Sequence, residues 1–313
     1  MLTAGVDLGG TKVFAALVDE AGEIRARATR PTEPDAATRS TLRTLAALLD
    51  ASDERPSAVG VAAAAMVERP SGRAMFSPNL AFEDPDLGAA IRGRFGLPSV
   101  VVNDATAATW AEHQHGAGRG VADMILLTVG TGIGGGAIVD GRLLQGDRGY
   151  AGEFGHITLV EGGPMCGCGQ RGCLEALASG TAIGRMAREG IGSAGDSIVL
   201  ELAGDQPQRI TGALVAEAAH AGDEYAAGIL ERAGRWLGTG LASLVNVFDP
   251  ALVVVGGGAA GAGWFLLEPA RQELGQRVGD RRPPPRIVAA ALGNDAGALG
   301  AAALAREHAA HNR

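Results

Sequence analysis

Two stretches of the chain share one pattern: AGVDLGGTKVFAALVD at residues 4–19 and ILLTVGTGIGGGAIVD at residues 125–140. They align without a gap, and each consists of an apolar run, a glycine-rich tight turn, a second apolar run and a closing Asp. Each stretch predicts a β-hairpin, because short apolar runs bounded by glycine are typical of buried strands. The repeat is either a duplicated domain or two unrelated hairpins, and we favour the duplication.

Along the whole chain, short apolar runs alternate with longer segments of helical period. The predicted strands are residues 58–62, 99–102, 124–129 and 252–255, and the predicted helices are residues 36–50, 105–115, 181–189, 212–220, 224–247 and 295–311. This alternation predicts an α/β fold with mostly parallel sheets. At about 100–200 residues per domain, a chain of 313 residues is expected to form two domains.

The composition excludes several classes of protein. Hydrophobic residues make up 46% of the chain and charged residues 20%, which is typical of globular rather than disordered proteins. The net charge of −8 argues against a nucleic-acid partner, because binding a phosphate backbone needs a clustered basic surface. Only one of the 27 basic residues is a lysine, Lys12, and its position fits neither a P-loop nor the strand lysine of a protein kinase.

Neither a signal peptide nor a membrane span is expected. Met1-Leu2-Thr3 leads directly into an apolar strand, without the basic segment that is typical of a signal peptide. The longest apolar stretch, residues 237–267, is interrupted by Asn246, Asp249-Pro250 and several glycines, so it cannot cross a bilayer as one helix. We therefore expect a cytoplasmic protein.

The glycine-rich turns are suited to binding phosphate. Successive N–H groups in such a turn can converge on an anion, and this needs no lysine. Asp7 stands beside the first turn, where its carboxylate would repel phosphate unless Mg²⁺ and its hydration waters lie between them.

Two glycine patterns also match the dinucleotide-binding motif, Gly130-x-Gly132-x-x-Gly135 and Gly256-x-Gly258-x-x-Gly261. A strand rather than a helix is predicted after the first, and the second lacks an acidic residue at the usual spacing. A turn against adenosine is the interpretation that we prefer for the second.

Asn103-Asp104 follows the predicted strand 99–102 and precedes the predicted helix 105–115. One interpretation is that Asp104 is simply the helix N-cap, where Asp is favoured. The other is that its carboxylate, at the carboxyl edge of a parallel strand, accepts the proton of a hydroxyl group that attacks phosphorus. The two roles are compatible.

The cysteines indicate a metal site. All three fall in the stretch Cys166-Gly-Cys168-Gly-Gln-Arg-Gly-Cys173, and His156 lies ten residues upstream. Three thiolates and one imidazole suit a closed tetrahedral zinc site, with free thiols as the alternative. An odd number of cysteines in a cytoplasmic protein disfavours disulfides. A metal there would hold Glu153, His156 and Glu175 rigid enough to bind the hydroxyls of a ligand.

These motifs together resemble the ROK family, and within it the actinobacterial type of bacterial glucokinase. The resemblance covers essentially the whole chain and rests on the following segments: Asp7-Leu-Gly-Gly-Thr-Lys12, Ser77-Pro-Asn79-Leu80, Asn103-Asp104, Gly130-Thr-Gly-Ile-Gly-Gly-Gly136, Glu153-Phe-Gly-His156, Cys166 to Glu175, and Val255-Gly-Gly-Gly258. The cysteine block with its following Glu is the most specific of them.

The resemblance implies an actin-like, hexokinase-like ATPase fold, in which a ribonuclease H-like motif is duplicated around a central cleft. It places residues 1–116 and the C-terminal helix, residues 296–313, in a small α/β domain. Residues 117–295 would form the large α/β domain, with the second phosphate turn, the zinc site, the adenosine side and the oligomer contacts.

The resemblance also implies the role of each candidate residue. Asp104 would be the general base that deprotonates the sugar 6-hydroxyl, and the sugar hydroxyls would be held by Asn79, Asn103, Asp104, Glu153, His156 and Glu175. His156 would direct one ring nitrogen to zinc and the other to the sugar. ATP would be bound by Gly9, Gly10, Thr11, Lys12, Thr131, Gly132, Gly256, Gly257 and Gly258. Asp7 would hold Mg²⁺ through water, and Zn²⁺ would be bound by His156, Cys166, Cys168 and Cys173.

The implied function is phosphorylation of glucose at C6 by ATP, with Mg²⁺ and a structural Zn²⁺ as cofactors and a homodimer or homotetramer as the assembly. Ala65 departs from the family pattern, which has glycine there, so another hexose remains an alternative: mannose, fructose, N-acetylmannosamine or N-acetylglucosamine. ADP or polyphosphate remains an alternative phosphoryl donor. A sugar-responsive repressor is disfavoured, because the first phosphate-turn strand leaves no room for an N-terminal helix-turn-helix module. A catalytically silent sugar-binding protein is disfavoured by Asp104 and the two turns.

Overall fold

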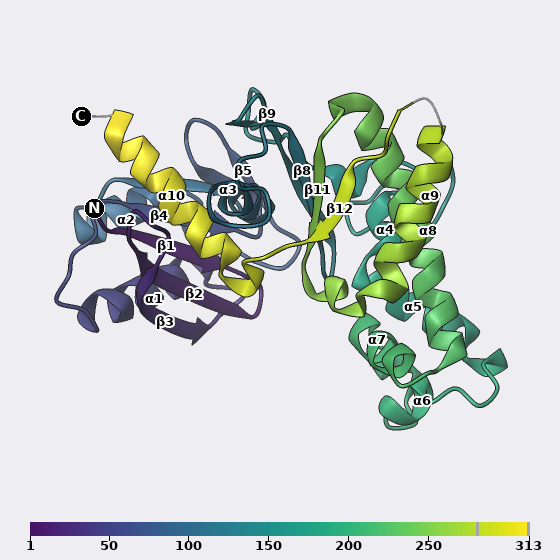
Figure 1. The fold of residues 1–313 in the computed structure, drawn as a ribbon. Helices are drawn as coiled ribbons and strands as arrows, with labels where there is room; N and C mark the ends of the chain where they lie inside the picture. The colour runs from purple at the N-terminus through teal and green to yellow at the C-terminus, as the bar shows by residue number, and fades with distance from the viewer. Residues whose placement is uncertain (280–281, 312–313) are drawn as a thin grey trace. The chain divides into compact units, whose positions relative to one another are not determined.

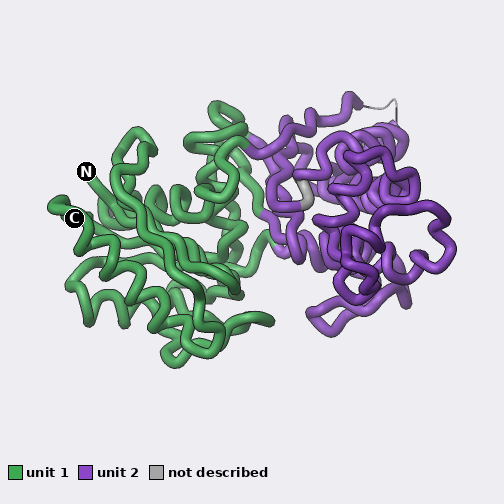
Figure 2. Tube along the Cα trace, turned by 90° about the horizontal axis from the view of Figure 1, so that it is seen from below, with its two compact units in different colours: residues 1–122, 136–152, 291–313 green, residues 123–135, 153–290 purple. Residues whose placement is uncertain are grey.

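The computed structural model describes residues 1–279 and 282–311. The chain forms two compact units (Figure 2): unit 1 comprises residues 1–122, 136–152 and 291–313, and unit 2 comprises residues 123–135 and 153–290. The expected small domain falls within unit 1, except that residues 312–313 of its terminal helix lie outside the described residues.

Unit 1 also contains residues 117–122, 136–152 and 291–295, which the family resemblance assigns to the large domain. The longest of these segments, residues 136–152, contacts other parts of unit 1. The N–H of Arg69 donates to the carbonyl of Arg148 at 2.9 Å, and Gly136 lies against the side chain of Thr109.

Unit 1 is built on a five-stranded sheet with the order β3-β2-β1-β4-β7. β1 and β2 form the expected antiparallel hairpin, whereas β1, β4 and β7 run parallel to one another. The strands are β1 (Thr3–Leu8), β2 (Lys12–Val18), β3 (Ile24–Pro31), β4 (Val59–Ala63) and β7 (Ser99–Asn103), with a separate hairpin of β5 (Met66–Glu68) and β6 (Arg73–Phe76).

The helices of unit 1 are α1 (Ala37–Asp50), α2 (Leu87–Phe95), α3 (Asp104–His115) and α10 (Ala296–His311). α10, the last helix of the chain, packs on β1, β4 and α3 (Figure 1). Glycines allow this close packing, because a side chain at Gly5 or Gly60 would overlap the α10 backbone and one at Gly300 would overlap the α3 backbone. In the last turn of α3, the buried carboxylate of Glu112 accepts the N–H of Leu292 at 2.8 Å.

The second sheet repeats the order of the first. Its order is β10-β9-β8-β11-β12, and β8, β11 and β12 run parallel while β9 and β10 are antiparallel. The hairpin of residues 125–140 thus occupies in its sheet the position that the hairpin of residues 4–19 occupies in the first, which supports the predicted duplication. The strands are β8 (Met124–Val129), β9 (Ile133–Val139), β10 (Arg142–Leu143), β11 (Leu252–Gly256) and β12 (Arg286–Ala289).

Unit 2 contains most of the remaining helices. They are α4 (Leu174–Ala178), α5 (Gly180–Gly190), α6 (Val199–Leu202), α7 (Gly212–His220), α8 (Glu224–Phe248) and α9 (Trp264–Val278). Short 3₁₀ turns are η1 (Phe154–His156), η2 (Ile191–Ser193), η3 (Pro207–Arg209) and η4 (Gly258–Ala262) in unit 2, and η6 (Gly293–Asp295) in unit 1. Among the described residues, no helix combines the length and apolar character needed to cross a bilayer.

Replacing Gly60 by alanine is expected to destabilise unit 1, because the added methyl group would overlap the carbonyl of Ala301 in α10. Overpacking of this kind costs about 1–3 kcal/mol of unfolding free energy, and backbone contact places it at the upper end. Thermal and urea unfolding measure the loss. Gly93→Ala in α2 is the matched control, since nothing lies within 4 Å of its added Cβ and alanine favours the helix. Equal stability of G60A and G93A would contradict the assigned packing.

Candidate functional site

The first glycine-rich turn joins β1 to β2 and is held in shape by hydrogen bonds. The N–H of Gly9 donates to the carbonyl of Lys12 at 3.1 Å, and the hydroxyl of Thr32 donates to the carbonyl of Gly9 at 2.7 Å. Gly10, Thr11 and Lys12 are exposed. Asn79, a predicted sugar-binding residue, lies beside the turn, so that a Cβ on Gly10 would stand 3.5 Å from the Cβ of Asn79.

Asp7, near the end of β1, is half-buried close to Asp104. Burial and, to a smaller extent, the charge of Asp104 raise the pKa of Asp7 to about 7 against the opposing effect of Lys12. Gly297 near the start of α10 makes room for the carboxylate, since a Cβ there would lie 2.8 Å from the Cγ of Asp7. Two carboxyl groups beside the first glycine-rich turn suit a hydrated divalent cation, because Mg²⁺ prefers carboxylate and water oxygens.

Asp104 follows β7 and is the first residue of α3, one residue before the predicted start of that helix. The N-cap, however, is Asn103, whose side-chain oxygen accepts the N–H of Thr106 at 3.1 Å. The alternative that Asp104 is merely the cap is therefore wrong. The carboxylate of Asp104 instead accepts the Nδ2 group of Asn103 at 3.0 Å and the N–H of Ala105 at 2.9 Å. These bonds use one carboxylate oxygen and orient the half-buried group at the carboxyl end of β7.

Ala65 lies at the position where the family pattern has glycine, and the structure accommodates it. It is 6% exposed and is not among the described residues with positive φ. Its carbonyl accepts the Nδ2 group of Asn103 at 3.2 Å. The alanine therefore needs no strained backbone, and it lies directly beside a predicted sugar-binding residue.

The second glycine-rich turn joins β8 to β9. The N–H of Gly130 donates to the carbonyl of Gly132 at 2.9 Å, which closes the turn. The segment after Gly132 is the strand β9 rather than a helix, so the dinucleotide pattern of residues 130–135 does not occur in its functional context.

A cavity of about 410 Å³ opens beside this turn in unit 2. Thr131 and Gly258, both predicted to bind ATP, line it, whereas Gly256 ends β11 and Gly257 adopts a φ of 86° between β11 and η4. Sequence patterns did not predict most of its wall, which is contributed by α5, α7 and α8 and includes Thr181, Arg188, Thr211 and Leu230. The sequence feature that could have indicated this wall is the group of small residues at two helix starts, Ser179-Gly180-Thr181 and Thr211-Gly212.

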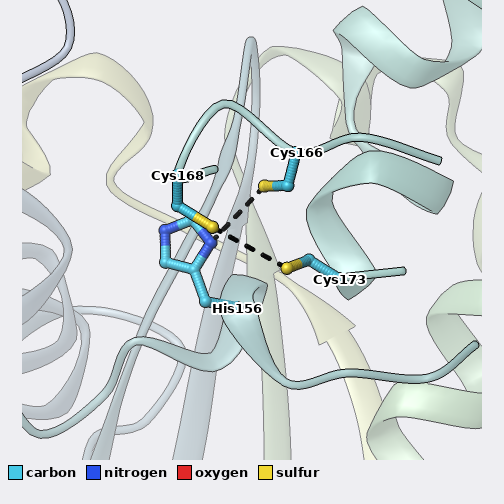
Figure 3. A group of neighbouring side chains, drawn as sticks. All are labelled: His156, Cys166, Cys168 and Cys173. Atoms are coloured by element: carbon cyan, nitrogen blue, oxygen red, sulfur yellow. Dashed lines mark hydrogen bonds between the residues drawn. The ribbon is translucent and has the colours of Figure 1, made fainter. Parts of the chain in front are cut away.

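The predicted metal ligands come together in unit 2 (Figure 3). The cysteine segment folds as a tight hairpin, in which Met165 pairs with Arg171 and the N–H of Cys166 donates to the carbonyl of Gln170 at 2.8 Å. This hairpin brings Cys166 and Cys168 close to Cys173, which precedes α4. The imidazole of His156 enters from η1.

The four side chains fit a tetrahedral metal site. Their ligand atoms all lie within 4.8 Å of one another, with 3.8 Å between the sulfurs of Cys168 and Cys173 and 3.7 Å between Cys166 Sγ and His156 Nδ1. Zn–S bonds of about 2.3 Å and Zn–N bonds of about 2.0 Å would separate such atoms by roughly 3.5–3.8 Å. Burial raises the pKa of the Cys166 and Cys173 thiols, and a bound cation would favour their thiolates.

The two ring nitrogens of His156 face different neighbours. Nδ1 faces Cys166, and Nε2 lies 3.8 Å from a carboxylate oxygen of Glu153. Burial raises the pKa of Glu153, His156 lowers this pKa and Glu175 raises it. The three residues therefore form one polar group beside the cysteines.

Comparison with known proteins establishes the family, because residues 3–308 match the ROK family over nearly the whole chain. The chain belongs to the ROK family. A glucokinase of Streptomyces coelicolor is 40% identical to it over 314 residues, with 98% of each chain covered. An N-acetylmannosamine kinase of Escherichia coli O9:H4 is 35% identical over 317 residues, with 98% of this chain and 99% of the relative covered.

The fold of this ROK protein also matches a solved structure of the family. The crystal structure of a ROK family glucokinase from Streptomyces griseus in complex with glucose and AMPPNP superposes with a TM-score of 0.89 at 39% identity, covering 98% of this chain and 100% of that chain. The expected hexokinase-like α/β fold is confirmed.

Asp7 is expected to make stability fall as pH rises. Its pKa of about 7 in the folded protein lies above the ordinary value of 3.8, so the folded state keeps a proton that the unfolded state has lost between these pH values. Stability is therefore highest below about pH 4 for this group and decreases by roughly 3–5 kcal/mol as pH rises through 7. Asp7→Asn removes this dependence, so D7N should be more stable than the wild type at pH 8 and lose that advantage at pH 4.

Urea unfolding without added metal or nucleotide, measured between pH 4 and 8, tests this expectation. Asp53→Asn, at an exposed loop position, is the control and should leave the profile unchanged. A D7N profile parallel to the wild type would show that Asp7 does not hold its proton in the folded state.

Proposed function

We propose that this protein transfers the γ-phosphoryl group of ATP to the C6 hydroxyl of glucose, forming glucose 6-phosphate and ADP. The observation that carries the proposal is the placement of Asp104 at the carboxyl end of β7, near Asp7 and the first glycine-rich turn. The glucokinase relatives and the structure with glucose and AMPPNP support the same chemistry.

Asp104 acts as the general base in this mechanism. Its carboxylate accepts the proton of the 6-hydroxyl while the sugar oxygen attacks the γ-phosphorus. The new O–P bond forms as the bond from the γ-phosphorus to the bridging oxygen breaks, and ADP leaves with that electron pair. The hydrogen bonds from Asn103 and Ala105 to Oδ1 orient the carboxylate for this proton transfer.

The remaining hydroxyls of the sugar are assigned to polar side chains. In unit 1 these are Asn79 and Asn103 besides the base. In unit 2 the group of Glu153, His156 and Glu175 carries this assignment. Carboxylates accept hydrogen bonds from hydroxyl groups, and an imidazole or an amide can donate or accept. His156 Nε2, on the side of the ring away from Cys166, is the nitrogen available to the sugar.

ATP is assigned to the glycine-rich turn of each unit and to the cavity. In unit 1 the first turn, Gly9 to Lys12, would face the phosphates. In unit 2 the backbone N–H groups of Thr131 and Gly132 would do so, and the cavity that Thr131 and Gly258 line would take the adenosine. Mg²⁺ would neutralise charge that develops on the transferred phosphoryl group, and Asp7 would hold its hydration water.

The cluster of His156, Cys166, Cys168 and Cys173 is assigned to a structural Zn²⁺. The closed set of four N and S ligands supports this assignment, since catalytic zinc sites keep one position open. A homodimer or homotetramer remains a prediction.

The preferred hexose needs a direct test, because two observations bear on it. One is the similarity to an N-acetylmannosamine kinase, and the other is the position of Ala65 beside Asn103. A coupled assay that crosses glucose, mannose, fructose, N-acetylmannosamine and N-acetylglucosamine with ATP, ADP and polyphosphate decides among them. Glucose with ATP is expected to give the highest kcat/KM. Turnover with none of these pairs would contradict the proposed function.

Asp104→Asn is expected to lower kcat by about 10²–10⁴-fold, because a general base contributes on that order to the rate. Glucose affinity, measured by calorimetry, should change far less, since the amide retains an oxygen acceptor. An unchanged kcat in D104N would exclude the role of Asp104 as the base.

Lys12→Arg is expected to raise the KM for ATP several-fold although the charge is kept. The first turn is tight, and a planar guanidinium replaces a compact ammonium poorly at such a site. Arg25→Lys, at an exposed position in β3, is the reverse control and should not change the KM. If the KM of K12R for ATP equals that of the wild type, Lys12 contributes only its charge.

A further inference from the structure

The segment that follows the cysteine block makes three hydrogen bonds to the second phosphate turn, all within unit 2. The Oε2 atom of Glu175 accepts the N–H of Ile133 at 2.9 Å. The N–H of Gly180 donates to the carbonyl of Gly130 at 2.7 Å, and the hydroxyl of Thr181 donates to the carbonyl of Thr131 at 2.7 Å. Both sides of the turn are therefore bound to one short stretch, residues 173–181.

The turn is also complementary in shape to the carboxylate. A Cβ on Gly132 would overlap Oε2 of Glu175, so only glycine leaves room for the side chain at this point. The hydrogen bond to Ile133 and the close approach to Gly132 fix the carboxylate directly against the turn. The position of Glu175 therefore determines the position of the backbone that would face phosphate.

The other side of Glu175 contacts the cysteine cluster. Its Oε1 atom lies 3.3 Å from the sulfur of Cys166. Cys173, which is fully buried, immediately precedes α4, and the N–H of Leu174 donates to the carbonyl of Ile157 at 3.0 Å. The start of α4 is thus held between the cluster and the strand segment that follows His156.

We propose that residues 173–181 position the second phosphate turn, with Glu175 and Thr181 as positioning residues, so that a metal ion in the cysteine cluster sets the affinity for the phosphates of ATP. This inference rests on the proposed function, whose ATP site it deepens. It assigns Glu175 a second role, which is compatible with binding a sugar hydroxyl because a carboxylate has about four acceptor positions.

Thr181 gives the first test, since it belongs neither to the cluster nor to the assigned sugar ligands. Removing its hydroxyl in Thr181→Val is expected to weaken binding of AMPPNP by roughly 2–10-fold in the absence of sugar, as calorimetry measures. Thr181→Ser keeps the hydroxyl and should bind within about two-fold of the wild type. Thr239→Val is the matched control, because it removes a hydroxyl-to-carbonyl bond within α8 and should have no effect.

Thr181 also lines the adenosine cavity, so binding of adenosine alone distinguishes the two ways in which it could act. A positioning residue for the turn affects AMPPNP but leaves adenosine binding, followed by NMR titration, within about two-fold. Equal weakening of adenosine and AMPPNP in T181V, or no weakening of AMPPNP, would overturn the role of Thr181.

The metal gives the second test. Removal of the metal from the wild type with a chelator (stripping) is expected to weaken AMPPNP binding about 10-fold or more, and adding back Zn²⁺ should restore it. With its metal in place, Glu175→Ala should bind AMPPNP about 10–100-fold more weakly than the wild type, because a charged hydrogen bond is lost. Removing the metal should change the AMPPNP affinity of this variant by less than two-fold. Zinc content and circular dichroism show that each protein is loaded and folded.

Gly132→Ala provides an independent variant should E175A fail to fold. It keeps every ligand and Glu175 itself, but its methyl group displaces the carboxylate from the turn, so its AMPPNP affinity should also fall and become insensitive to stripping. Undiminished AMPPNP binding by the stripped wild type, or equal loss on stripping in wild type, E175A and G132A, would overturn the proposal. A wild type that binds AMPPNP without phosphorylating any hexose refutes the proposed function alone.

Discussion

The architecture of unit 1 depends on the close approach of one helix to a sheet. α10 can lie directly on β1 and β4 because Gly5 and Gly60 present no side chain, and Gly300 allows α10 to meet α3 in the same way. Interiors are packed at crystal-like density, so these contacts leave no freedom for the two helices to shift independently. The three glycines therefore help to set the orientation of α3, and with it that of Asp104 at its first residue.

The same contact shapes the electrostatics around Asp7. The carboxylate at the end of β1 faces Gly297 in the first turn of α10, where the helix presents N–H groups and positive potential. Burial and the charge of Asp104 nevertheless raise its pKa to about 7, so the helix end and Lys12 together do not compensate the two acids. A cation beside the two acids would compensate the remaining charge, as the proposed Mg²⁺ would.

The elements that were predicted correctly are those whose residues are contiguous or close in the sequence. The hairpins of residues 4–19 and 125–140 were recognisable because their apolar runs and glycine turns are contiguous, and the cysteine cluster because its ligands are close in the sequence. α7 begins and ends where its apolar period predicted, at Gly212 and His220. The order of the strands in the two sheets then followed the predicted duplication.

What the sequence did not reveal depends on contacts between distant segments. Residues 136–152 belong to unit 1 because of packing against Thr109 and pairing with Arg69, which no local signal indicates. The cavity beside Thr131 is walled by α5 and α7, whose separation from the turn exceeds 40 residues in the chain. Asn103 rather than Asp104 caps α3, and two adjacent residues that both favour caps cannot be distinguished by propensity.

The repeated hairpins have diverged in a way that the alignment makes explicit. Asp7 and Lys12 of the first correspond to Thr128 and Ile133 of the second, so the second hairpin retains the shape of the turn without its charges. If the two halves descend from one ancestral unit, they have diverged at these two positions. The first half keeps an acid and a base beside its turn, whereas the second keeps the turn without a charge at either position. An ancestral homodimer of identical halves would have carried the same side chains in both turns, and fusion of the halves would have allowed the two turns to change independently.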